Sequence, residues 1–200
     1  MKLLIVALGL LLGSSLQAQD FAKHLTEART AYTGGKLEDA RFAMQQMMHE
    51  LDIITGKEVL TLLPQKLDTL SANIPHDEVT GASGFTGVVI HRDYGKAIAQ
   101  DGSEDKVSLE VITNSPLLGA LNGLLALPIL GNNPDQKVVK INGYKALVTK
   151  VSSTGEKDAF EVQLPLNNSL ITLKAPGYNQ DKIVAMANTI PVAAIAKAIQ

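Results

Sequence analysis

The chain has 200 residues, of which 46% are hydrophobic, with four Tyr, four Phe and no Trp. It contains no Cys, so neither disulfides nor thiolate-bound metals can stabilise it, and an aliphatic core must do so. The formal net charge of −2, without a basic stripe, argues against nucleic acid or an anionic membrane surface as a partner.

The first 18 residues have the pattern of a secretory signal peptide. Met1-Lys2 supplies a positive charge, residues 3–12 form an apolar run, and small and polar residues lead to a cleavage site after Ala18. The run is shorter than the roughly 20 residues of a membrane-spanning helix. No Cys follows it, which argues against a lipoprotein. We therefore expect an exported mature chain, periplasmic or secreted, with no stable membrane span.

Residues 19–72 are predicted to form a helical hairpin region. Ala28, Ala31 and Tyr32 share one side of a first helix, which Gly34-Gly35 ends. The next helix has an apolar stripe at spacings of four and three residues, through Ala40, Met44, Met47, Leu51 and Ile54. We expect Gly56 to stop this helix and a short helical segment to follow at 57–63.

Residues 28–41, A-x-x-A-Y-x-x-G-K-L-E-D-A-R, resemble the middle of a tetratricopeptide unit. Only one such unit occurs, whereas an array needs about three to be stable. A single hairpin that docks on the rest of the chain is the better interpretation.

Residues 73–200 are predicted to form a sheet domain, after a linker at 71–87. Strand patterns follow at 85–94 and 107–113, then a hairpin at Asn142-Gly143 and a strand pair across Asn167-Asn168. An apolar helix at 117–127 lies between Pro116 and Pro128, and a C-terminal helix begins near Asn179. The fold class is α+β: an N-terminal αα-hairpin, a largely antiparallel sheet of about six strands with one apolar crossover helix, and a C-terminal helix.

Several short motifs together resemble a family of uncharacterised exported bacterial proteins. They are L-E-D-A at 37–40, L-L-P at 62–64, a Gly-rich strand entry at 81–87, N-S-P-L-L at 114–118 and K-I-N-G-Y-K-A at 140–146. The C-terminal part is similar in element order to Mog1/PsbP-like domains and, more distantly, to the lipoprotein-carrier LolA type. The resemblance implies a binding or accessory module and no activity.

Motifs with catalytic associations are incomplete. His91-Arg92-Asp93 matches the start of a kinase catalytic loop, but Ile98 stands where a metal-binding Asn is needed and no D-F-G occurs. Ser103-x-x-Lys106 lacks its companion motifs, and Ser83 misses the nucleophile-elbow pattern. We interpret 91–93 as polar residues that alternate at a strand end, and we predict no catalytic residue.

Two clusters of potential metal ligands also have a structural interpretation. Met44, Met47, Met48 and His49 could bind copper(I), but Met44 and Met47 lie on the apolar stripe, where we expect core packing. His76-Asp77-Glu78 is interpreted as a solvated loop, because adjacent residues rarely converge on one ion. Gly81, Gly84 and Gly87 are expected to mark a sheet edge or a bend. No metal or cofactor is predicted.

The sequence favours a non-enzymatic exported binding or accessory protein of the cell envelope. One alternative is a carrier of a hydrophobic ligand or lipid, in a cavity between the sheet and the 117–130 helix. A second is an enzyme of unrecognised type. The partner would be another envelope protein or a hydrophobic small molecule. The candidate surface consists of leucines on the apolar helix: Leu117, Leu118, Leu121, Leu125 and Leu127.

Overall fold

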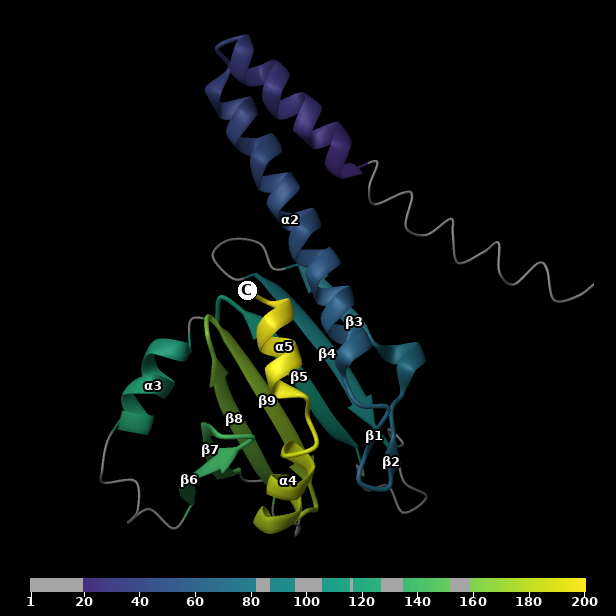
Figure 1. The fold of residues 1–200 in the computed structure, drawn as a ribbon, viewed down its shortest axis with the longest axis vertical. Coiled ribbons are helices and arrows are strands. Elements are labelled where there is room, and N and C mark those ends of the chain that lie inside the picture. The colour runs from purple at the N-terminus through teal and green to yellow at the C-terminus, as the bar shows by residue number, and fades with distance from the viewer. Residues whose placement is uncertain (1–19, 82–86, 96–105, 116, 127–134, 152–158) are drawn as a thin grey trace, which may run out of the picture. The chain divides into compact units, whose positions relative to one another are not determined.

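The computed structural model describes residues 20–81, 87–95, 106–115, 117–126, 135–151 and 159–200 (Figure 1). These residues belong to two compact units, one that ends at Ile54 and one that comprises Thr55–Gln200. The division falls inside a helix, whereas the sequence led us to expect a boundary at residues 72–73. The predicted signal peptide at 1–18 lies outside the described residues.

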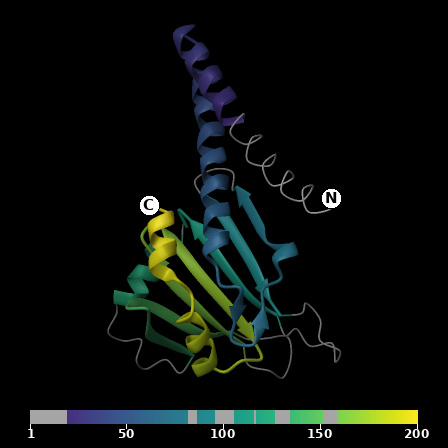
Figure 2. The same ribbon diagram turned by 45° about the vertical axis from the view of Figure 1, so that its right-hand side comes forward.

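The first unit is a helical hairpin, as predicted. A helix at residues 20–33 is followed by a tight turn and by α2, Leu37–Leu62. Gly35 has a φ of 74°, and the N–H of Lys36 donates to the carbonyl of Ala31 at 2.9 Å. This bond, with that from the N–H of Gly35 to the carbonyl of Tyr32, forms a Schellman motif. The helix at 20–33 lies beside the first half of α2 in both views (Figures 1 and 2).

Gly56 does not stop α2, and our prediction there was wrong. The helix continues to Leu62, so the segment predicted at 57–63 is the end of α2. A Cβ at Gly56 would lie 2.6 Å from Cγ1 of Val79 and 3.0 Å from Cγ2 of Val88. The glycine is needed because the sheet comes close to the helix backbone at this position.

The second unit contains a seven-stranded sheet in the order β3-β4-β5-β9-β8-β7-β6, with every neighbouring pair antiparallel. The strands are β3 (Glu78–Gly81), β4 (Val88–Tyr94), β5 (Val107–Thr113), β6 (Gln136–Ile141), β7 (Tyr144–Val151), β8 (Ala159–Leu166) and β9 (Ser169–Pro176). The α+β class and the antiparallel sheet are confirmed. The extra strand is β3, at the sheet edge, where we predicted a linker; its single large apolar residue, Val79, gave too weak a pattern.

Short elements connect α2 to the sheet. They are a two-stranded ribbon of β1 (Lys66–Leu67) and β2 (Leu70–Ser71), followed by the 3-10 turn η1 (Ile74–His76). The N–H of Asn73 then donates to the carbonyl of Asp93 at 2.8 Å. The chain that follows α2 is therefore attached to β4 through its backbone.

The predicted turns have the expected backbone conformation. Asn142 and Gly143 have φ values of 48° and 89°, as a type I′ turn requires, and Asn167 has a φ of 54°. At the C-terminus, the side chain of Asn179 accepts a hydrogen bond from the N–H of Lys182 at 2.9 Å and caps α4 (Gln180–Ala187). After a short break, α5 (Val192–Ala198) completes the chain.

Helices cover both faces of part of the sheet. Leu147 and Val148 are adjacent in β7 and point to opposite faces, yet both are buried. The helix α3 (Leu118–Ala126) packs on the face that carries Leu147. α4 contacts β7, β8 and β9, and α4 and α5 lie over one face of the sheet in both views (Figures 1 and 2). The predicted helix at 117–127 is thus a crossover helix that packs on the sheet, and Pro116, Leu127 and Pro128 lie outside the described residues.

Candidate functional site

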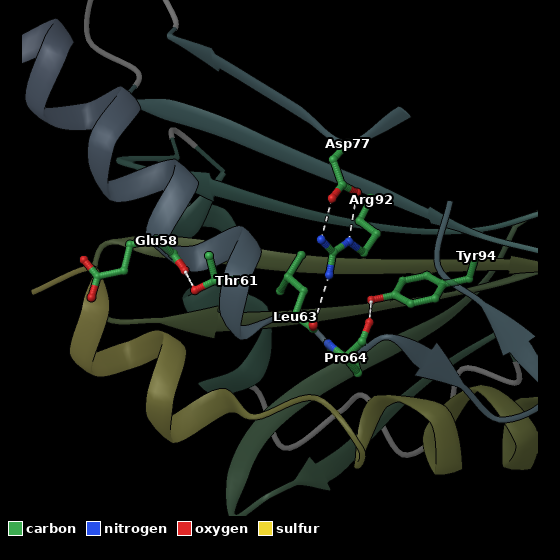
Figure 3. A network of polar contacts seen from close by, with 7 residues as sticks. All are labelled: Glu58, Thr61, Leu63, Pro64, Asp77, Arg92 and Tyr94. Carbon is green, nitrogen blue, oxygen red and sulfur yellow. Dashed lines mark hydrogen bonds and ion pairs between the residues drawn. The ribbon is translucent and has the colours of Figure 1, made fainter. Parts of the chain in front are cut away.

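A buried polar network connects the end of α2 to β4 (Figure 3). The guanidinium of Arg92 makes a bidentate ion pair with Asp77, with Nε 2.8 Å from Oδ1 and Nη2 bonded to Oδ2. Its Nη1 also donates to the carbonyl of Leu63 at 3.0 Å. The hydroxyl of Tyr94, which is wholly buried, donates to the carbonyl of Pro64 at 2.9 Å.

The pKa values of both β4 side chains are raised. The hydrogen bond from Arg92 to Asp77 raises the pKa of the guanidinium above its usual range. Burial raises the pKa of Tyr94 to about 12. Both groups therefore keep their protons over the neutral range, and their bonds go to carbonyls and a carboxylate of the chain itself. We interpret the network as structural, because it satisfies groups that would be costly to bury alone.

The His91-Arg92-Asp93 triplet separates onto two faces of β4. Nε2 of His91 lies 2.9 Å from Oδ1 of Asp93, and Nζ of Lys106 lies 2.8 Å from Oδ2 of the same carboxylate. Arg92, between them, points the other way, toward Asp77. The interpretation as alternating polar residues is confirmed.

The His76-Asp77-Glu78 group does not converge. Asp77 is paired with Arg92, whereas His76 and Glu78 are exposed. We predicted a solvated loop, and that prediction is wrong for Asp77, because Arg92 is fifteen residues away and the pairing depends on the fold. Among the described residues, no group of three or more His, Cys, Asp or Glu side chains could hold a metal ion.

At Gly87, the residue before β4, the surroundings leave no room for a side chain. A Cβ at Gly87 would lie 2.1 Å from Oγ1 of Thr113, and the N–H of Val88 donates to that oxygen at 2.8 Å. Gly81 ends the edge strand β3. Gly84, Ser83 and Ser103 lie outside the described residues.

The candidate leucines of α3 divide into packed and exposed members. Leu121 and Leu125 are buried in a cluster with Leu147 and Leu170, and Leu118 packs against this cluster. Leu117 is 53% exposed, and Leu127 lies outside the described residues. The two central leucines of this stretch therefore contact the sheet. A docking role for the stretch stays a prediction.

A hollow beside the start of α4 has a volume of about 460 Å³ and is open to solvent. Two of its polar side chains have structural partners: Asn179 caps α4, and Nζ of Lys182 lies 2.7 Å from Oδ2 of Asp68. The hydrogen bond from Lys182 lowers the pKa of Asp68. We find no reason to assign a ligand to this hollow.

The most conspicuous surface feature lies on the helical hairpin. Among the residues that the structure describes, eight of the eleven exposed large hydrophobic side chains fall within residues 20–54. The hairpin has little core of its own, since the only fully buried residues between 20 and 54 are Ala28, Ala40 and Ala43. Large apolar side chains therefore face solvent where a closed unit would bury them.

Met44 belongs to this exposed set, which corrects our prediction that it packs in the core. Met44 is 50% exposed and Met48 is 59% exposed, while Met47 is half-buried. The helix at 20–33 covers only the side of α2 that carries Ala40 and Ala43. The stripe was identified correctly, but only one edge of it has a neighbour.

Six of the exposed side chains lie on one face of the hairpin. Leu37, Met44 and Leu51 are seven residues apart, which is two turns, and so are Leu25 and Tyr32. When each helix is viewed along its axis from its N-terminus, its exposed stripe lies to the same side of its buried alanines. Because the two helices are antiparallel, both stripes therefore lie on the same face of the hairpin. We call this the hairpin apolar face: Leu25, Tyr32, Leu37, Met44, Met48 and Leu51.

The hairpin apolar face was not predicted as a site from the sequence. The spacing of seven residues that defines it was available, yet spacing alone does not show which apolar residues lack a neighbour. Phe42, 63% exposed, lies on the opposite side of α2 and is not part of the face.

Comparisons with protein-family models, curated proteins and solved structures gave no match. The resemblance to exported proteins with Mog1/PsbP-like or LolA-like domains therefore stays a prediction. Among the described residues, no helix is both long and apolar enough to cross a membrane.

Proposed function

We propose that the protein is a non-enzymatic binding or accessory module of the cell envelope, which binds a partner protein through the hairpin apolar face. The observation that carries the proposal is the concentration of exposed large apolar side chains on one face of residues 20–54. Such a patch is typical of a protein interface, because water is expelled from apolar surface when a partner covers it.

The polar clusters support a binding role over catalysis. Arg92 and Asp77 hold α2 to β4, and the carboxylate of Asp93 is shared between His91 and Lys106. These groups are used in contacts within the fold, and none of them lines the described hollow. The proposal of export rests on the signal-peptide pattern of residues 1–18.

The carrier hypothesis is not favoured by any specific contact. It needs space between the sheet and the 117–130 helix, whereas Leu121 and Leu125 pack against Leu147 and Leu170. We therefore propose a protein partner and not a lipid.

Photocross-linking in living cells tests the proposal directly. A photoreactive amino acid replaces Met48 on the hairpin apolar face or, as a matched control, Phe42 on the other side of α2. We expect position 48 to give a defined protein adduct and position 42 to give none, with the adduct identified by mass spectrometry. Equal labelling at both positions, or none at either, would contradict the proposal.

A further inference from the structure

We infer that the occupant of the hairpin apolar face is a second copy of this chain, with the two α2 helices antiparallel across a twofold axis. This inference rests on the proposed function and names its partner. Two hairpins joined in this way make a four-helix bundle, whose core comes from the faces that each hairpin leaves exposed.

The spacing of apolar residues in α2 indicates that the partner is a helix. Leu37, Ala40, Met44, Met47 and Leu51 alternate at three and four residues, which is the seven-residue repeat of helices that pack side by side. Ala40 is buried and Met47 is half-buried, whereas Leu37, Met44 and Leu51 are exposed. One row of the repeat is therefore used inside the hairpin, and the other row is free for a second helix.

Charges beside this row favour self-pairing. Arg41 and Asp52 lie on the same edge of the hairpin apolar face, eleven residues or about 16 Å apart along α2. Neither has an ion-pair partner among the residues that the structure describes. The midpoint between Arg41 and Asp52 along α2 nearly coincides with the midpoint between Met44 and Met48. A twofold axis through this point would place Arg41 of each copy beside Asp52 of the other copy.

The opposite orientation is disfavoured by the same charges. Parallel α2 helices would place Arg41 beside Arg41 and Asp52 beside Asp52, and like charges in register destabilise an interface. Partial burial raises the pKa of Asp52, and the smaller opposing effect of His49 does not offset it. An arginine from a second copy would add a permanently charged cation.

The exposed area is sufficient for a dimer. The six side chains are 43% to 65% exposed. With roughly 150 Å² on each large side chain, the low end of the range for aromatic residues, the face offers on the order of 500 Å² per copy. Two copies would then bury about 1,000 Å² in total, which is at the lower limit for a specific interface.

Sedimentation velocity on the purified mature chain, residues 19–200, over a range of concentrations, tests the inference. We expect a dimer at tens of micromolar. Met48→Asp should give a monomer, while Phe42→Asp, the matched control, should remain a dimer; far-UV circular dichroism checks that both keep their helix content. A monomeric parent chain at these concentrations would overturn the inference.

Charge reversal tests the orientation. Arg41→Asp and Asp52→Arg should each weaken the dimer on the order of tenfold, and the double variant should restore the parent affinity, since each pair is then reversed. Additive weakening in the double variant would overturn the antiparallel arrangement.

The cross-linking experiment separates the two proposals. An adduct at position 48 with a different protein supports the proposed function and overturns self-association. An adduct with residues 3–12 of the same chain overturns both, because the face is then covered internally. An adduct between two copies supports both.

Discussion

The helical hairpin and the sheet unit bury their apolar residues to very different extents. Among the described residues, the sheet unit has a core of large aliphatic side chains and three exposed large hydrophobics, Ile74, Leu117 and Leu124. The hairpin, with far fewer residues, exposes eight and buries three alanines. Since apolar burial is the main source of stability, the described part of the sheet unit has its own core, whereas the hairpin has large apolar surface left to bury.

The largest effect on stability is expected from the Arg92 network, which connects the end of α2 to β4 within the sheet unit. Arg92→Ala leaves the largely covered carboxylate of Asp77 without its cation and should lower the free energy of unfolding by about 3–5 kcal/mol. Lys174→Ala, which removes an exposed ion pair with Glu161, should change it by less than about 1 kcal/mol. Urea denaturation followed by circular dichroism measures the free energy of unfolding of both variants. Equal losses would show that the Arg92 network stabilises the fold no more than an ion pair at the surface does.

Alkaline pH should destabilise the sheet unit through Tyr94. The pKa of Tyr94 is raised from 10.0 to about 12, so the folded protein holds this proton more tightly than the unfolded chain. The resulting stability is fully present below pH 10 and is lost as the pH rises to about 12, with a total of about 2–3 kcal/mol. Denaturation curves at stepped pH should show this loss, and Tyr94→Phe should remove the Tyr94 contribution; an unchanged pH dependence in that variant contradicts the assignment.

A smaller effect is expected where α2 meets the sheet. Gly56→Ala places a methyl group against Val79 and Val88, and overpacking should outweigh the gain in helix propensity, for a net loss of about 1–2 kcal/mol. Gly119→Ala in α3 is the matched control, because nothing lies within 4 Å of its added carbon. That variant should be neutral or more stable by up to about 1 kcal/mol. Thermal denaturation should give a lower midpoint for Gly56→Ala and an unchanged or higher midpoint for Gly119→Ala. If Gly56→Ala loses no more stability than Gly119→Ala, the close contact at Gly56 is not limiting.

The smallest effect is expected at the exposed side of the hairpin. Phe42→Ser replaces a side chain that is 63% exposed and lies away from the hairpin apolar face. The free energy of unfolding should change by less than about 0.5 kcal/mol. A substantially larger loss in urea denaturation would mean that Phe42 also packs against another residue. The two sides of α2 would then not differ in the way described above.

Local sequence signals were sufficient for most elements of the fold. The N–G dipeptide at 142–143, the double glycine at 34–35 and the cap at Asn179 each gave the turn or helix end that the structure has. Regular alternation in Val107–Thr113 gave a strand with one buried face. These signals work because the conformation depends on residues that are neighbours in the chain.

Other features depended on residues far apart in the sequence. The edge strand β3 exists because β4 pairs with it, and Asp77 is held in an ion pair because β4 brings Arg92 beside it. Gly56 looked like a helix stop, whereas the approach of Val79 decides its role. None of these pairings leaves a trace in local periodicity.

The sequence by itself determined the α+β class, the antiparallel hairpins and which residues of α2 form an apolar stripe. Only the tertiary structure decided which of those residues have neighbours: Ala40 is buried against the helix at 20–33, while Met44 and Met48 face solvent. The reason is physical. Periodicity fixes the direction in which a side chain points, but burial depends on what another part of the chain, or another molecule, places there.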